Sequence, residues 1–442
     1  MDIEVKINDE VLIYSPPINE YTKKWGVYAI PRMWMEPTGE LIVRFNGEED
    51  SACLDEMKQD ESIYFKSCDN GENWEYVGKG NNCYDISVLT GINPPYLKLK
   101  DSSVIAVRYK ENLPPIAAEL PFEKEFAMPN GRAIVRTYSY GSIPGACKGM
   151  ELICIPAGKS EPQICDIQFD FDEREVWVDV RVSHDGKVFY DVPQYVQPYI
   201  FKAPYFSGLT ELTDGTLVAV TCGRNPNVSD HYCSVVYLVA SEDGGITWRK
   251  RGIVAESADK VPYGYGGAGA EVSLTKTEND DLFCVMRMDM CVEPNVDKPV
   301  CDTMFAVSKD GGYTWTEPVS VADSSVTPHI VALKDGILLL IYGRPGVHMK
   351  YSTNNGITWS DSISLIGLTL EQERMLGRSD ADSKYFGTSS YSNTFVEKLS
   401  EDTVLVIYNN VKYMPENGEG HKAAFVKQIT LKKNNVQIID KS

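Results

Sequence analysis

Short apolar runs alternate with polar turns along the chain, and six stretches share one layout. Each has an apolar run, a turn that contains Gly, Asp or Ser, and a second apolar run. The stretches are "MWMEPTGELIVRF", "YLKLKDSSVIAVRY", "LTELTDGTLVAVTCGR", "VSLTKTENDDLFCVMR", "IVALKDGILLLIYGR" and "FVEKLSEDTVLVIYNN". Short apolar runs bounded by turn residues are typical of antiparallel β-strands. The pattern therefore predicts six two-stranded units, each supplying the first two strands, A and B, of a larger sheet.

A second motif recurs between these stretches, with the pattern Ser-x-Asp/Asn-x-Gly-x-Thr/Asn-Trp. Its copies end at Trp74, Trp248, Trp315 and Trp359, and a weaker copy in "VDVRVSHDGKVFY" brings Phe189 near the Trp position. Asp, Asn and Ser side chains hydrogen-bond nearby backbone groups in tight turns, and Gly supplies a positive φ. Each copy predicts a hairpin with a buried aromatic side chain. The motif resembles the Asp-box of sialidases and of several unrelated propellers.

Together the two repeats predict an all-β protein, a six-bladed β-propeller of four-stranded antiparallel blades. Each Asp-box is then the turn between strands C and D of a blade. We expect one domain over residues 1–442, with the N-terminal strand "EVKINDEVLIY" completing blade 6. The long gap between the second and third stretches predicts an insertion in blade 2, at about residues 110–175, before a C strand in "EVWVDVRVS".

The charge and composition of the chain restrict the kinds of partner and the compartment that we expect. The chain has a formal net charge of -20 over 442 residues, which argues against nucleic acid and anionic membrane surfaces as partners. It has no apolar run long enough to span a membrane. Eleven Cys residues without a CxxC pair favour a reducing compartment, and the acidic start "MDIEVKINDE" is unlike a signal peptide. We therefore expect a cytoplasmic protein, or a secreted one if a leader was removed.

Antiparallel order places the starts of the A strands and the ends of the B strands at one end of the ring, opposite the Asp-boxes. Several B strands end in Arg, namely Arg224, Arg287 and Arg344. A single Arg of this kind can pair with a neighbouring acid. Several that converge on one depression favour a small anionic ligand, because guanidinium binds carboxylate in a bidentate manner.

This layout resembles the sialidase (neuraminidase) superfamily over nearly the whole chain outside the insertion. The resemblance implies that three arginines clamp the carboxylate of a sialic acid: Arg32, Arg287 and Arg344. It also implies a nucleophile at Tyr391, its base at Glu271 and a general acid/base at Asp50, for which Glu48, Glu49 and Asp55 are rivals. An attacking carboxylate would be repelled by the sugar carboxylate, and a Tyr activated by a Glu avoids this repulsion.

Two positions depart from the family pattern. The order around the first arginine is "IPRM", and Asn409 and Asn410 stand where the family has a Glu that orients this arginine. Three functions follow as hypotheses: an exo-sialidase or a relative that acts on a similar acidic sugar, an exo-glycosidase for another sugar that uses His329, and a non-catalytic carbohydrate-binding propeller. No His/Asp cluster has ligand spacing, so we expect neither a metal nor another cofactor.

Overall fold

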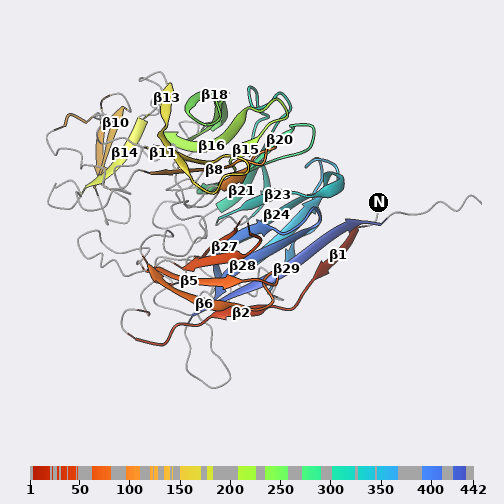
Figure 1. Ribbon diagram of the computed structural model, residues 1–442. Helices are drawn as coiled ribbons and strands as arrows, with labels where there is room; N and C mark the ends of the chain where they lie inside the picture. Colours follow the sequence, from red (N-terminus) through yellow and green to blue (C-terminus); the bar gives the residue numbers. More distant parts are fainter. Residues whose placement is uncertain are drawn as a thin grey trace, which may run out of the picture.

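The computed structural model describes residues 3–19, 22, 27–28, 31–36, 38–45, 47, 62–80, 96–109, 120–122, 124–127, 134–139, 142, 150–170, 177–182, 208–224, 234–256, 271–289, 301–323, 327–343, 346–366, 391–410 and 422–434. Their strands form six blade sheets and one separate three-stranded sheet (Figure 1). The predicted all-β fold, a six-bladed propeller, is confirmed. Within these residues, no helix has the length and hydrophobicity needed to cross a membrane.

The first three blades are given from the inner strand outward. Blade 1 contains β3 (Pro31–Met35), β4 (Leu41–Phe45), β5 (Ser62–Ser67) and β6 (Glu75–Gly80). Blade 2 contains β7 (Tyr96–Lys98), β8 (Val104–Tyr109), β11 (Met150–Ile155) and β12 (Gln163–Asp166). Blade 3 contains β15 (Thr210–Glu211), β16 (Leu217–Arg224), β17 (Ser234–Ser241) and β18 (Thr247–Glu256), with β13 (Gln168–Asp170) parallel to β18.

The other three blades follow the same order. Blade 4 contains β19 (Val272–Lys276), β20 (Leu282–Asp289), β21 (Cys301–Ser308) and β22 (Val319–Ala322). Blade 5 contains β23 (His329–Ala332), β24 (Leu338–Gly343), β25 (Val347–Ser352) and β26 (Ile363–Ser364), with the 3-10 turn η8 (Lys334–Gly336) between its first two strands. Blade 6 contains β27 (Tyr391–Lys398), β28 (Thr403–Asn410), β29 (Ala423–Lys433) and the N-terminal strand β1 (Ile3–Ile7).

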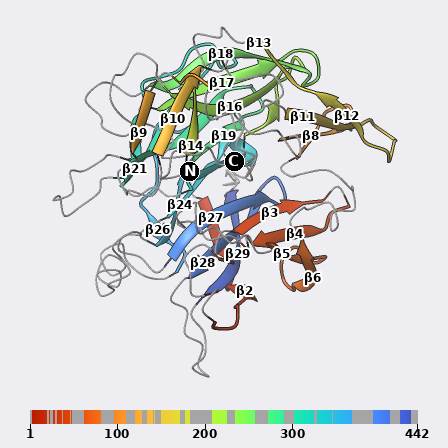
Figure 2. The ribbon, with the colours of Figure 1, turned by 90° about the vertical axis from the view of Figure 1, so that its left-hand side faces the viewer.

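The N-terminal segment completes blade 6, as predicted. Both β1 and β2 (Val11–Tyr14) pair with β29 in antiparallel register. Figure 2 shows blade 1 beside this closing blade, with β8, β11 and β12 next to blade 1 on its other side. The two ends of the described chain therefore share one sheet, which joins the first and last blades of the ring.

Blade 2 differs from the sequence prediction. Its third strand is β11, from "GMELICIP", which pairs with β8, whereas "EVWVDVRVS" forms β14 (Trp177–Val182). Strand β14 pairs with β10 (Ile134–Ser139), which also pairs with β9 (Lys124–Ala127), and this separate sheet lies beside β16 of blade 3 (Figure 2). The weaker copy of the motif therefore does not follow the third strand of a blade. Strands β11 and β12 lie within the predicted insertion range, yet belong to the propeller.

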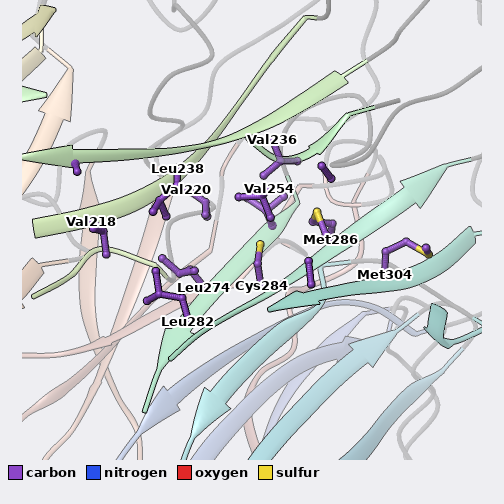
Figure 3. Close-up of a cluster of buried hydrophobic side chains, with 14 of the residues drawn as sticks. Val218, Val220, Val236, Leu238, Val254, Leu274, Leu282, Cys284, Met286 and Met304 are labelled. Atoms are coloured by element: carbon purple, nitrogen blue, oxygen red, sulfur yellow. The ribbon is translucent and has the colours of Figure 1, made fainter. Parts of the chain in front are cut away.

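The core lies between neighbouring blades. Figure 3 shows the cluster between blades 3 and 4, where Leu238 and Val254 face Leu282 and Met286. Comparable clusters join blades 2 and 3, blades 4 and 5, blades 5 and 6, and blades 6 and 1. Because both faces of most blades are covered, their strands have nearly continuous apolar runs, as in "LLLIYG" of β24.

Three of the Asp-boxes close their turns with the same bonds; in the fourth, at residues 352–359, the Ser and Asn bonds recur, but Trp359 Nε1 has no hydrogen-bond partner among the described residues. In the first, Ser67 Oγ accepts the N–H of Gly71 at 2.9 Å and donates to Asp69 at 2.8 Å, while Asp69 accepts the N–H of Asn73 at 2.9 Å. Trp74 Nε1 donates to the Gly71 carbonyl at 3.1 Å. The same bonds recur in the boxes at residues 241–248 and 308–315. Hydrogen bonds from the Asn73 side chain and backbone, then from Ser67, lower the pKa of Asp69 to about 2. These carboxylates are structural.

Candidate active site

The inner strands begin at the end of the ring opposite the Asp-box turns, and partly or fully buried charged and polar side chains gather there. Glu271 directly precedes β19, and Arg287 lies near the end of its partner strand β20. Arg287 Nη1 donates to Glu271 Oε1 at 2.8 Å, and the side chains are 19% and 15% exposed. The Arg287 N–H also donates to the Glu271 carbonyl at 3.0 Å. Backbone pairing and an ion pair thus hold these two residues together.

Thr327 contacts the second carboxylate oxygen of Glu271. Its backbone N–H donates to Glu271 Oε2 at 2.7 Å, and its φ is 44°. Left-handed backbone is uncommon for a β-branched residue; such strain costs about 1–3 kcal/mol and persists only where the surroundings impose it. Thr394 of β27 supplies those surroundings: its N–H donates to Thr327 Oγ1 at 2.8 Å, and its Oγ1 donates to the Thr327 carbonyl at 2.9 Å.

His329 lies at the start of β23, as predicted, and is buried. Its Nε2 donates to the Thr394 carbonyl at 3.0 Å, which assigns the proton to that nitrogen. Its ring packs on Phe395 with 5.0 Å between centroids, and the Arg32 guanidinium lies over the same phenyl ring at 5.9 Å. Burial, with a contribution from the positive charge of Arg32, lowers the pKa of His329 to about 4. The imidazole is therefore neutral at pH 7.

Arg32 is buried at the start of β3, the inner strand of blade 1. Its Nη1 donates to the Pro31 carbonyl at 2.9 Å, and strand β3 lies beside β27. Phe395 is thus flanked by a cation from blade 1 and a neutral imidazole from blade 5. The described contacts form one continuous series from Arg287 to Arg32, through blades 4, 5, 6 and 1.

The other predicted site residues are placed in part or lie outside the described residues. The backbone of Tyr391 begins β27, and that of Arg224 ends β16, both at the site end of the ring. Asp50 and Arg344 lie outside the described residues, as do Glu48, Glu49 and Asp55. Asn409 is buried near the end of β28, and its side-chain amide has no hydrogen-bond partner among the described residues.

Sequence reasoning missed Thr327, Thr394 and Phe395. Thr327 stands two residues before His329 in "VTPHIVAL", and Thr394 and Phe395 follow Tyr391 in "YSNTF". All three lie within four residues of His329 or Tyr391 in the sequence, and this closeness is the signal that could have identified them. Among the described residues, no group of three His, Cys, Asp or Glu side chains is arranged to hold a metal ion.

Comparison with known sequences supports the repeat. Residues 350–361 match the model of the BNR/Asp-box repeat, and this segment is the turn after β25. No curated protein matches the chain. The matched repeat confirms the Asp-box motif that was predicted from the sequence.

Solved structures extend the comparison to the whole chain. A protein of unknown function from Dyadobacter fermentans shares 18% identity with a TM-score of 0.55, covering 96% of this chain and 99% of that chain. A Hadza microbial sialidase shares 16% identity with a TM-score of 0.44, covering 90% of this chain and 65% of that chain. An alpha-L-arabinofuranosidase from Fusarium graminearum shares 12% identity with a TM-score of 0.45, covering 95% and 98%. The chain is thus a six-bladed propeller that carries the BNR/Asp-box repeat.

Proposed function

We propose that this chain is a retaining exo-glycosidase that releases terminal sialic acid, or a related acidic sugar, from glycans. The observation that carries the proposal is the Glu271–Arg287 pair, held at the end of the ring where β27 begins with Tyr391. A base for a phenol and a cation for a substrate carboxylate are the two groups that this reaction requires side by side.

In the proposed first step, Tyr391 Oη attacks the anomeric carbon while Glu271 takes the phenol proton. The bond from this carbon to the leaving oxygen breaks, and Asp50 protonates that oxygen. In the second step, Asp50 takes a proton from water, the water oxygen bonds to the anomeric carbon, and the phenol leaves with the proton from Glu271. Each Glu271 oxygen already accepts one hydrogen bond, and a carboxylate oxygen has room for a second, from Tyr391.

The proposed substrate carboxylate would lie among Arg32, Arg287 and Arg344. Arg287 uses Nη1 for Glu271, and a guanidinium has five N–H donors, so the same group can also serve a substrate carboxylate. The Arg32 side chain is held by its hydrogen bond to the Pro31 carbonyl and by the face of the Phe395 ring. Both contacts limit its rotamers before substrate binds. Such preorganisation favours transition-state binding.

The alternative in which His329 acts chemically on another sugar has less support. Its Nε2–H is committed to a carbonyl, and its low pKa leaves no imidazolium to donate a proton at neutral pH. We assign His329 to the wall of the site, where it supports Phe395. Only a measurement of substrate turnover distinguishes the proposed function from a non-catalytic carbohydrate-binding propeller.

The test is hydrolysis of a panel of 4-methylumbelliferyl glycosides that includes the α-sialoside and the α-L-arabinofuranoside. We expect turnover of the sialoside, lost in Tyr391→Phe and Glu271→Gln. Turnover of a neutral glycoside without the sialoside would overturn the acidic-sugar assignment. Binding of sialosides with no turnover of any would favour a carbohydrate-binding propeller.

A further inference from the structure

Thr327 and Thr394 form a threonine clasp between blades 5 and 6. The N–H of Thr394 donates to Thr327 Oγ1 at 2.8 Å, and Thr394 Oγ1 donates to the Thr327 carbonyl at 2.9 Å. Both side chains are buried. Thr394 donates both of these buried bonds, and together they fix the two backbones relative to each other, because breaking either bond leaves a buried polar group without that partner.

The clasp also reaches Glu271. The backbone N–H of Thr327 donates to Glu271 Oε2 at 2.7 Å, and the positive φ of Thr327 accompanies this orientation. The Glu271 carboxylate is therefore held from two sides, by Arg287 on Oε1 and by Thr327 on Oε2. One side comes from its own blade, and the other is fixed by strand β27 through Thr394.

Strand β27 also carries Tyr391, three residues before Thr394. We infer that Thr327 is a positioning residue, which through the threonine clasp sets the Glu271 carboxylate relative to the strand that carries the nucleophile. This inference rests on the proposed function, in which Glu271 takes the proton of Tyr391. A base misplaced by about 1 Å can reduce turnover by a factor of order a hundred, even when binding is unchanged.

The chain offers a matched control for the clasp. Thr275 Oγ1 accepts the N–H of Ala332 at 3.0 Å, a bond of the same kind between blades 4 and 5. Among the described residues, no hydrogen bond connects Thr275 or Ala332 to the Glu271 carboxylate. Thr275→Val and Thr327→Val each replace a hydroxyl by a methyl group of similar volume, and each removes an acceptor for a backbone N–H from the next blade. Only Thr327→Val weakens the clasp.

The experiment measures kcat and KM for the 4-methylumbelliferyl sialoside in Thr327→Val, Thr327→Ser and Thr275→Val. We expect Thr327→Val to lower kcat by about 10–100-fold with KM within about threefold of wild type. Thr327→Ser keeps both the hydroxyl and the N–H, and should restore most of kcat. Thr275→Val should lower the melting temperature, by less than Thr327→Val does because its bond is only part-buried, and should leave kcat within about twofold.

Two results separate this inference from the proposed function. If Thr327→Val keeps wild-type kcat while Tyr391→Phe loses turnover, the positioning role is wrong and the proposed function stands. If Tyr391→Phe keeps turnover, or if the wild type hydrolyses no sialoside, the proposed function is wrong and the positioning role falls with it. Equal losses of kcat in Thr327→Val and Thr275→Val would reduce the clasp to a structural contact.

Discussion

Arg287 and Glu271 are joined twice, by a backbone hydrogen bond of 3.0 Å and by an ion pair of 2.8 Å. The two bonds fix the direction of both side chains at the point where β19 and β20 meet the site end of the ring. A carboxylate with this much support remains oriented without help from a substrate. The pair is therefore the element of the proposed site whose geometry is best defined.

Substitutions of Glu271 and of Arg287 should have different effects on kcat and KM. Glu271→Gln keeps the shape but removes the base, so kcat for the sialoside should fall by about 10²–10⁴-fold. Arg287→Lys keeps the charge but loses the planar fork that serves both Glu271 and the substrate carboxylate, so it should raise KM as well as lower kcat. Steady-state kinetics of both variants check this contrast. Full kcat in Glu271→Gln would show that another group activates the nucleophile.

His329 should make the protein sensitive to acid. Because its pKa falls to about 4 in the fold, the unfolded chain binds more protons than the native chain between about pH 6.5 and pH 4. Stability from this group is present above that window and is lost as pH falls through it, by about 3 kcal/mol in all. Urea unfolding at pH 7 and pH 4 should show a smaller loss for His329→Gln than for wild type. Parallel losses in the two proteins would contradict the assignment.

Glu397 of β27 should make the protein less stable as the pH rises, which is the opposite of the effect of His329. Burial raises the pKa of this carboxyl to about 8, despite an opposing hydrogen bond from the Met35 backbone. The native chain then holds a proton that the unfolded chain releases, so stability is present at low pH and is lost as pH rises from about 4.5 to 8. Because the side chain retains some solvent access, we expect the free energy of unfolding to fall by about 2 kcal/mol, which is less than the full pKa shift would give.

The Glu397→Gln variant isolates this effect. Its free energy of unfolding, relative to wild type, should rise steadily between pH 5 and pH 8.5, as measured by urea denaturation. A constant difference between the two proteins across this range would mean that Glu397 is ionised in the fold at pH 5 already.

The Asp-box glycines should differ from other glycines with positive φ. A Cβ on Gly356 (φ 78°) would lie 2.3 Å from the ring of Phe305 in the preceding blade, whereas one on Gly158 (φ 71°) would meet nothing within 4 Å. Gly158→Ala should therefore cost only the left-handed strain, about 1–2 kcal/mol. Gly356→Ala should cost about 1–3 kcal/mol more, because the buried ring must shift. Equal melting temperatures for the two variants would contradict this account.

The propeller was predictable because its signals are local. The apolar runs and the Ser-x-Asp-x-Gly turns each occupy fewer than twenty residues, and repetition turned weak local signals into a count of blades. The third strand of blade 2 was not predictable in this way. Both "GMELICIP" and "EVWVDVRVS" have strand composition, and the choice between them depends on which pairs with β8, a long-range contact.

The placement of three candidate site residues along the ring was predictable from local signals too. Strand order alone placed Glu271, Arg287 and His329 at one end of the ring, and the described geometry is consistent with that placement. The threonine clasp was not predictable, because it depends on a left-handed backbone at Thr327. Local preference disfavours this conformation for a β-branched residue, so only the assembled blades can impose it.

The central claim is that Tyr391 forms the covalent intermediate, and trapping that intermediate tests it most directly. A phenol with an ordinary pKa near 10 is a poor nucleophile at pH 7 unless a base lies beside it. Wild-type protein treated with a 2,3-difluorosialic acid probe should gain the mass of one sugar adduct, and peptide mapping should place it on Tyr391. Tyr391→Phe should remain folded and gain no adduct. An adduct on another residue, or sialoside turnover that survives Tyr391→Phe, would contradict the account.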